Sequence, residues 1–158
     1  MKKIILITLA FILAACSSSS TQKTGIDREP QEWTDSQKAE FRRNQQKWKD
    51  ANISHYRYNF SRVCFFCSND GTGYMIEIQN GDIISVTYVD GSAITGQNWY
   101  LTIDEVFSAL KSESFGKGDT VTVKYDPAYG FPADVYIDNK EVTDDEKTLH
   151  ISKFEVLP

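Results

Sequence analysis

The sequence predicts an α+β domain: a curved antiparallel sheet of about six strands with two helices packed on one face, in the order α-β-β-β-α-β-β-β. Three observations lead to this prediction. Two segments begin with a capping box, which marks the start of a helix. Other segments alternate apolar and polar residues, as strands with one buried side do. The links between successive strands are short, so neighbouring strands should pair antiparallel.

The first helix is expected from Thr34 to about Ala51. Thr34 and Gln37 have the spacing of a capping box. The apolar stripe is thin, because only Phe41, Trp48 and Ala51 share a face while basic residues occupy much of the remaining surface. This pattern favours a solvated helix that rests on the sheet through two aromatic side chains over a basic, partner-binding helix.

The first strand is expected at residues 55–64, where Tyr56, Tyr58 and Phe60 alternate with polar residues. The aromatic side should face the core. A ligand groove is the alternative, and four aromatic residues could line it: Tyr56, Tyr58, Tyr74 and Trp99. Aromatic residues at strand spacing belong more often to a core, which favours the first interpretation.

A hairpin is expected around Asn80-Gly81, the strongest short-range hairpin signal. A two-residue loop would leave apolar residues on both faces. A three-residue loop from Gln79 to Gly81 would instead pair Ile76 with Ile84. This register gathers six apolar side chains on one face: Tyr74, Ile76, Ile78, Ile84, Val86 and Tyr88. Since a slip of one residue turns a strand over, the pattern predicts the longer, bulged loop.

The second helix is expected to begin at the capping box formed by Thr102 and Glu105. Its apolar residues recur at the spacing of a core-facing helix. Three strands should follow, near residues 121–125, 135–138 and 148–156. The apolar residues of the last strand change sides along its length, which predicts a bulge near Ser152-Lys153.

Residues 1–15 have the layout of a lipoprotein signal peptide. Lys2 and Lys3 precede an apolar stretch that is too short to span a bilayer. The stretch closes with Leu13-Ala14-Ala15-Cys16, which resembles the lipobox at which bacterial lipoprotein precursors are cleaved and lipidated. Cleavage would leave Cys16 as the lipidated first residue.

Residues 16–32 are expected to form the lipidated cysteine and a flexible polar tether, with an end-to-end distance of roughly 20 to 24 Å. Residues 33–158 are then expected to form a single α+β domain. Loss of Lys2 and Lys3 would lower the formal net charge from −5 to −7. An acidic protein of this kind is not expected to bind nucleic acid.

These features predict a cell-envelope protein that contacts the membrane through lipid on Cys16. Ser17 follows that cysteine, which favours the outer membrane, facing the periplasm or the surface, over the inner membrane. The expected function is a non-catalytic binding or structural module with an unidentified envelope protein or ligand as partner. The alternatives are a thiol-disulfide redox protein and a protein inhibitor of an envelope hydrolase.

Cys64 and Cys67 remain once Cys16 carries lipid. In an oxidising compartment such a pair favours a structural disulfide. Redox chemistry, metal binding and two unpaired thiols stay open. The motif ends a strand and leads into a turn, so no helix is expected to lower a thiol pKa there. Zinc would need two more ligands, and His55 and His150 are the only histidines.

No catalytic residue, metal site or cofactor is expected, because the chain carries none of the common nucleophile, phosphate-loop, zinc-protease or dinucleotide motifs. A carboxylate-rich stretch near the end of the chain lacks the spacing and glycine of a calcium loop. A solvated hairpin is favoured for it over an ion site. Its members are Asp138, Glu141, Asp144, Asp145 and Glu146.

The run from Val123 to Pro132, which contains Tyr-Asp-Pro-Ala-Tyr-Gly-Phe-Pro, is the most specific part of a family resemblance. Together with the Tyr-x-Tyr strand, the Asn80-Gly81 hairpin and the helix after Thr102, it resembles the bacterial envelope family catalogued as domain of unknown function 6174. The resemblance covers most of the chain from Trp48 onward. It implies a lipoprotein or secreted protein without an assigned reaction. The cysteine spacing departs from that family, whose pair is tighter and followed by proline.

The same run should form a rigid corner between two strands, because its prolines preset φ and its aromatic side chains can fold back on the core. A recognition loop is the alternative, since exposed tyrosine and phenylalanine often form binding surfaces. The residues concerned are Tyr125, Asp126, Pro127, Tyr129, Gly130, Phe131 and Pro132.

A structural disulfide predicts that alkylation of the denatured protein without reductant labels neither Cys64 nor Cys67. Mass spectrometry of the labelled peptides measures this. Quantitative labelling of both thiols would contradict the pairing, whereas labelling that appears only after reduction is expected.

Overall fold

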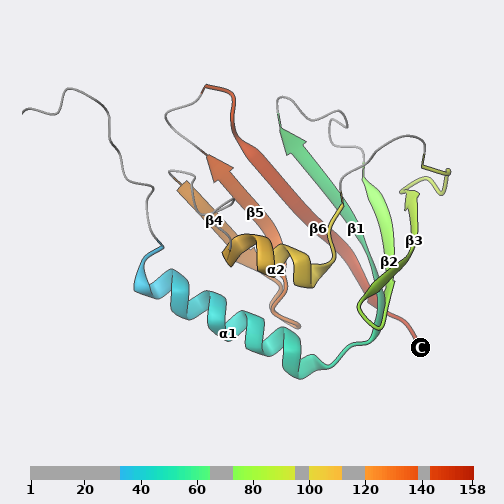
Figure 1. Ribbon diagram of the computed structural model, residues 1–158, viewed down its shortest axis with the longest axis horizontal. Coiled ribbons are helices and arrows are strands. Elements are labelled where there is room, and N and C mark those ends of the chain that lie inside the picture. Colours follow the sequence, from blue (N-terminus) through green and yellow to red (C-terminus); the bar gives the residue numbers. More distant parts are fainter. Residues whose placement is uncertain (1–32, 65–72, 95–99, 112–119, 139–142) are drawn as a thin grey trace, which may run out of the picture.

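A computed structural model of the chain describes residues 33–64, 73–94, 100–111, 120–138 and 143–158 (Figure 1). It confirms the predicted α+β class and element order. The elements are α1 (Asp35–Ala51), β1 (His55–Cys64), β2 (Tyr74–Gln79), β3 (Asp82–Tyr88), α2 (Ile103–Lys111), β4 (Thr120–Tyr125), β5 (Pro132–Asp138) and β6 (Lys147–Val156).

The sheet is antiparallel throughout and has the strand order β3-β2-β1-β6-β5-β4. The last strand, β6, therefore lies between β1 and β5 and joins the two α-β-β-β halves of the chain. Both helices lie on one face of the sheet (Figure 1). None of the described helices is long and apolar enough to cross a membrane.

Helix α1 begins and ends as its sequence predicts. Thr34 and Gln37 form both hydrogen bonds of the capping box. At the other end, Asn52 closes the helix in the left-handed conformation, with φ 49° and ψ 42°. Phe41 and Trp48 are its buried side chains, so the helix rests on the sheet through two aromatic rings.

Helix α2 lies closer to the centre of the core. Thr102 and Glu105 form its capping box, and its buried residues occupy one face. The Tyr58 hydroxyl donates a hydrogen bond to the main-chain carbonyl of Leu101, which ties β1 to the start of α2. The indole N–H of Trp48 donates to Asp104 at 3.2 Å, which links the two helices.

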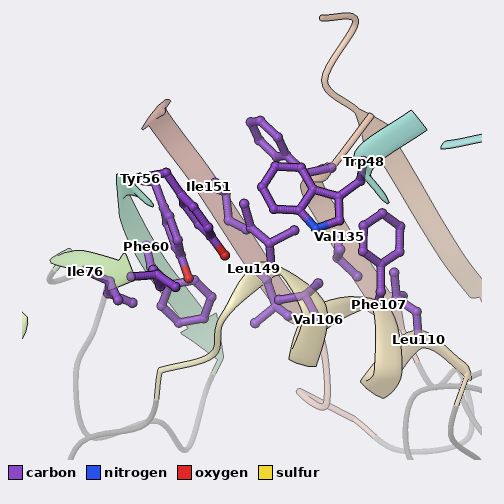
Figure 2. Close-up of a cluster of buried hydrophobic side chains, with 14 of the residues drawn as sticks. Trp48, Tyr56, Phe60, Ile76, Val106, Phe107, Leu110, Val135, Leu149 and Ile151 are labelled. Carbon is purple, nitrogen blue, oxygen red and sulfur yellow. The ribbon is translucent and has the colours of Figure 1, made fainter. Parts of the chain in front are cut away.

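The core lies between the helices and the sheet. Figure 2 shows side chains of β1 and β6 meeting those of α2, with Trp48 of α1 beside them. Burial of this aromatic and aliphatic layer supplies the main stabilisation of the fold. Its fully enclosed members include Tyr58, Phe60, Tyr74, Ile76, Ile78, Ile103, Val106, Phe107 and Val135.

The predicted three-residue hairpin loop is wrong. Asn80 and Gly81 alone form the loop, with φ 54° and 91°, and Gln79 pairs with Asp82. This positive-φ pair suits the twist of a two-residue hairpin. Beyond the loop, the β2–β3 pairing shifts by one residue between Ile78 and Glu77. Ile76 therefore faces Val86 rather than Ile84.

The inserted residue of β3 is therefore in the strand, not in the loop. Ile83 packs against the core, whereas Ile84 is 52% exposed. The apolar face predicted for the hairpin exists, but Ile83 takes the place that the sequence pattern gave to Ile84.

The predicted bulge in the last strand is confirmed. The β1–β6 register shifts between Arg57 and Asn59, and Lys153 of β6 has φ 50°. Leu149 and Ile151 before the bulge and Phe154 after it all contact the core. The extra residue thus keeps both apolar sets on one face.

The hairpin register predicts that two adjacent isoleucines differ in their contribution to stability. Ile83→Ala should lower the free energy of unfolding by about 1 to 2 kcal/mol, because a partly buried side chain is lost. Ile84→Ala should change it by less than about 0.5 kcal/mol, because the side chain is exposed. Both variants make the same change in the same strand, so differences in strand propensity largely cancel. Urea unfolding measures the two free energies. A larger loss in Ile84→Ala than in Ile83→Ala would contradict the observed register and support the three-residue loop.

Candidate functional site

The run that carries the family resemblance forms a tight corner between β4 and β5. The Asp126 carboxylate accepts hydrogen bonds from the main-chain N–H groups of Ala128 and Tyr129, at 2.9 and 2.7 Å. The main chain closes the corner through Gly130 N–H to Asp126 and Asp126 N–H to Phe131. An aspartate that binds backbone groups two and three residues ahead is a turn-forming device.

The corner is docked on α1. The Lys47 ammonium group donates to the carbonyl of Pro127. Gly130 has φ 81°, and a Cβ built on it would lie 2.6 Å from the main-chain oxygen of Asn44. Only glycine satisfies both the backbone conformation and this close approach. Phe131 is 2% exposed and packs on Trp48 of the same helix, with ring centroids 6.1 Å apart.

Most of the corner's side chains thus face inward. Phe131 and Pro132 are buried, Tyr129 is half-buried against Phe154, and Tyr125 is half-buried beside α1. Pro127 and Ala128 are exposed at its tip. The geometry favours the rigid-corner interpretation, and a recognition role for this run would have to use its tip.

Three of the four aromatic residues considered for a ligand groove belong to the core. Tyr56, Tyr58 and Tyr74 are at most 2% exposed. Burial raises the pKa of Tyr58 and of Tyr56 far above the ordinary value for tyrosine, so neither phenol ionises near neutral pH. Trp99 lies outside the described residues.

The opposite side of the sheet has a different character. No described helix packs on it, and we call this surface the uncovered face. Tyr136 of β5 and Val63 of β1 lie in one cross-strand row, separated by Thr148 of β6. Their side chains are 38% and 52% exposed. The face comprises Asn59, Ser61, Val63, Met75, Thr122, Lys124, Asp134, Tyr136, Thr148, His150 and Ser152 and continues to the charge pairs at one end.

Charged groups near this face are paired across strands. His55 bridges the Glu77 carboxylate and the main-chain oxygen of Pro158, each at 2.9 Å. These two hydrogen bonds raise the pKa of His55 above its ordinary value. Arg57 pairs with Glu155 at 2.7 Å, and His150 pairs with Asp134. Both histidines are thus held by carboxylates, which orients them but supplies neither an adjacent nucleophile nor a metal ligand set.

The predicted cysteine and carboxylate sites are only partly within the described residues. Cys64 ends β1, whereas Cys67 and Cys16 lie outside, so the disulfide and the lipid site remain predictions. Asp144 adopts φ 61° in the turn before β6, and Asp145 pairs with Lys147 at 3.0 Å. Glu146 is exposed in the same turn. Within the described ranges, no group of three or more potential metal ligands occurs.

A small pocket between α1 and β4 was not predicted. Its volume is about 150 Å³. Its α1 and β4 sides are some 80 residues apart in sequence, so no local pattern could bring them together. Of the lining residues, only Tyr125 had been predicted as a site residue, in the corner. The lining residues are Trp33, Gln37, Glu40, Val121, Thr122, Val123 and Tyr125.

These features define a small α+β domain with one helix-covered sheet face, one uncovered face and a locked β4–β5 corner. Comparison with known proteins agrees with the resemblance noted in the sequence. The chain belongs to the Family of unknown function (DUF6174), whose model matches residues 40–156. Neither a curated protein nor a solved structure matches the chain.

The docking of the corner on α1 predicts that Gly130→Ala is more destabilising than Gly91→Ala. Both glycines have positive φ, 81° and 85°, but a Cβ on Gly91 meets no atom within 4 Å. Gly91→Ala should cost about 1 kcal/mol for the backbone conformation alone. Gly130→Ala should cost about 3 kcal/mol, because α1 must also move. Thermal unfolding compares them, and equal losses would show that the corner does not press on the helix.

Proposed function

We propose that this protein is a cell-envelope lipoprotein whose folded domain is a non-catalytic binding or structural module. Lipid on Cys16 holds it at a membrane, most simply at the outer membrane, and residues 16–32 tether the domain. The lipobox-like Leu13-Ala14-Ala15-Cys16 and the polar composition of the tether support this anchoring. The partner is another envelope protein, and the binding requires no cofactor.

The uncovered face is the observation that carries the proposal. An antiparallel sheet with one packed and one solvated face needs polar residues on the solvated side. That side is mostly polar here, but it also carries an exposed tyrosine and an exposed valine, Tyr136 and Val63, in one row across the sheet. An exposed aromatic residue among small hydroxyl side chains is typical of a protein contact surface.

Two other functions use different features of the chain. A redox function would depend on Cys64 and Cys67 and on a helix that starts directly after Cys64, a segment outside the described residues. A hydrolase inhibitor would use the uncovered face itself, so it differs from the proposed module only in what it binds. Co-purification of a hydrolase whose activity falls on binding would favour the inhibitor.

Site-specific photo-crosslinking in cells tests the proposed surface. A crosslinking amino acid at position 63 or 136 is expected to capture the same partner protein, whereas one at Arg42, exposed on α1, is not. Cys16→Ser should release the full chain from the membrane fraction. Crosslinks from all three positions, or from position 42 alone, would contradict the assignment of the uncovered face.

A substitution tests whether Tyr136 contacts the partner while the crosslinker stays at position 63. Tyr136→Glu should reduce the crosslink from position 63 at least about fivefold, because a charge is placed in the contact surface. Its melting temperature should stay close to the wild-type value, since Tyr136 is exposed. An unchanged crosslink would show that Tyr136 does not touch the partner.

A further inference from the structure

Among the described strands, β4 lies at one edge of the sheet and has β5 as its single hydrogen-bonded neighbour. About half of its main-chain N–H and C=O groups therefore point away from the sheet. The start of α1 lies beside this strand. The Gln37 side chain of α1 donates a hydrogen bond to the main-chain carbonyl of Val121 at 3.4 Å. Helix and edge strand together form a groove, and a strand that lies in such a groove can add to the sheet.

The pocket at this edge has the chemistry of a cation site. Two of its lining residues are aromatic, Trp33 and Tyr125, and Glu40 contributes a carboxylate. Burial, with a further contribution from Glu40, raises the pKa of Tyr125, so its phenol stays neutral beside that carboxylate. Among the described ion pairs none involves Glu40. Aromatic rings next to a carboxylate attract an ammonium group.

The size of the pocket limits what can enter it. A cavity of about 150 Å³ holds a benzene ring. The aliphatic stem and ammonium group of one lysine side chain are of similar size. The stem would contact Val121 and Val123 while the charge stays near Glu40 at the rim, which is how long basic side chains commonly bury their carbon atoms.

We propose that β4 binds an extended segment of a partner protein as an added antiparallel strand, with a lysine side chain of that segment in the pocket. The inference rests on the proposed binding function and names one contact of the partner. The Val121 carbonyl already accepts from Gln37, so main-chain hydrogen bonds to the other outward-facing groups of β4 would supply affinity. The pocket would supply selectivity for the basic residue.

A second copy of this chain fits the edge less well. Paired antiparallel with β4, another β4 would present its valines on the helix side, because Val121 and Val123 lie on that face and Lys124 on the other. No cation would reach the pocket. Two copies would also bring two Glu40 carboxylates to the same edge, where like charges repel.

Peptide binding to the full chain in detergent micelles tests the proposal. The probe is a dye-labelled, end-capped peptide of alternating threonine and valine with one central lysine, followed by fluorescence anisotropy. Matched peptides carry a central glutamate, or the lysine together with N-methyl groups at alternate amides. The lysine peptide should bind, and both matched peptides should bind at least about tenfold more weakly.

Two substitutions on the same helix separate the pocket from general electrostatics. Glu40→Gln should weaken binding of the lysine peptide roughly threefold to tenfold. Asp50→Asn removes the same charge at the far end of α1, outside the pocket, and should leave binding unchanged.

Four results would overturn the inference: no binding at about 1 mM peptide, equal binding of the glutamate peptide, equal binding of the N-methylated peptide, or an unchanged affinity in Glu40→Gln. Reversible dimerisation that Val123→Pro abolishes would show that a second copy of the chain occupies the β4 edge, and this would also overturn the inference. Any of these results leaves the crosslinks from positions 63 and 136 unaffected, so a failure here is distinguishable from a failure of the proposed function.

Discussion

The bulge at Lys153 is the constraint on which the packing of the helix side depends. The inserted residue, with φ 50°, changes the side on which the following residues of β6 project. Phe154 consequently faces the helices, where its ring lies 4.8 to 5.9 Å from four other aromatic rings. These rings come from α1, β1 and the β4–β5 corner: Trp48, Tyr56, Tyr129 and Phe131. Without the bulge, Phe154 would project from the uncovered face and these elements would lose their common contact.

The position of the pocket follows from that cluster. Trp48 and Phe131 meet next to Phe154, so the corner is pressed against α1 while the helix is still held over the sheet. Gly130 permits the contact because it carries no side chain. Since the corner begins at Tyr125, the end of β4 is then fixed beside the helix, and the edge strand and α1 enclose a space along their length. A bulge in the central strand thus determines a feature at the sheet's edge.

Two bulges, one predicted and one misplaced, show how far the sequence determines this fold. In β6 the apolar residues change sides between Ile151 and Phe154, inside a strand with no turn nearby, so the insertion could be located. In the hairpin the same signal lay next to Asn80-Gly81, and either the loop or the strand could hold the extra residue. Periodicity shows that a residue is inserted but not where, because the choice depends on turn conformation. The strand order and the pocket depend on contacts between distant segments, which local patterns do not encode.

Folding constrains the side chains on the two faces of the sheet to different degrees. On the helix side, Trp48, Tyr56 and Phe154 each contact three or more other aromatic rings, so a substitution there disturbs a shared packing arrangement. On the uncovered face the stabilising contacts are pairs, such as Arg57 with Glu155, and exposed ion pairs contribute little to stability. Residues of that face can therefore change with small effect on folding. If the protein recognises a partner, the features that determine which partner should lie on the uncovered face and at the β4 edge, where the fold itself requires least of the side chains.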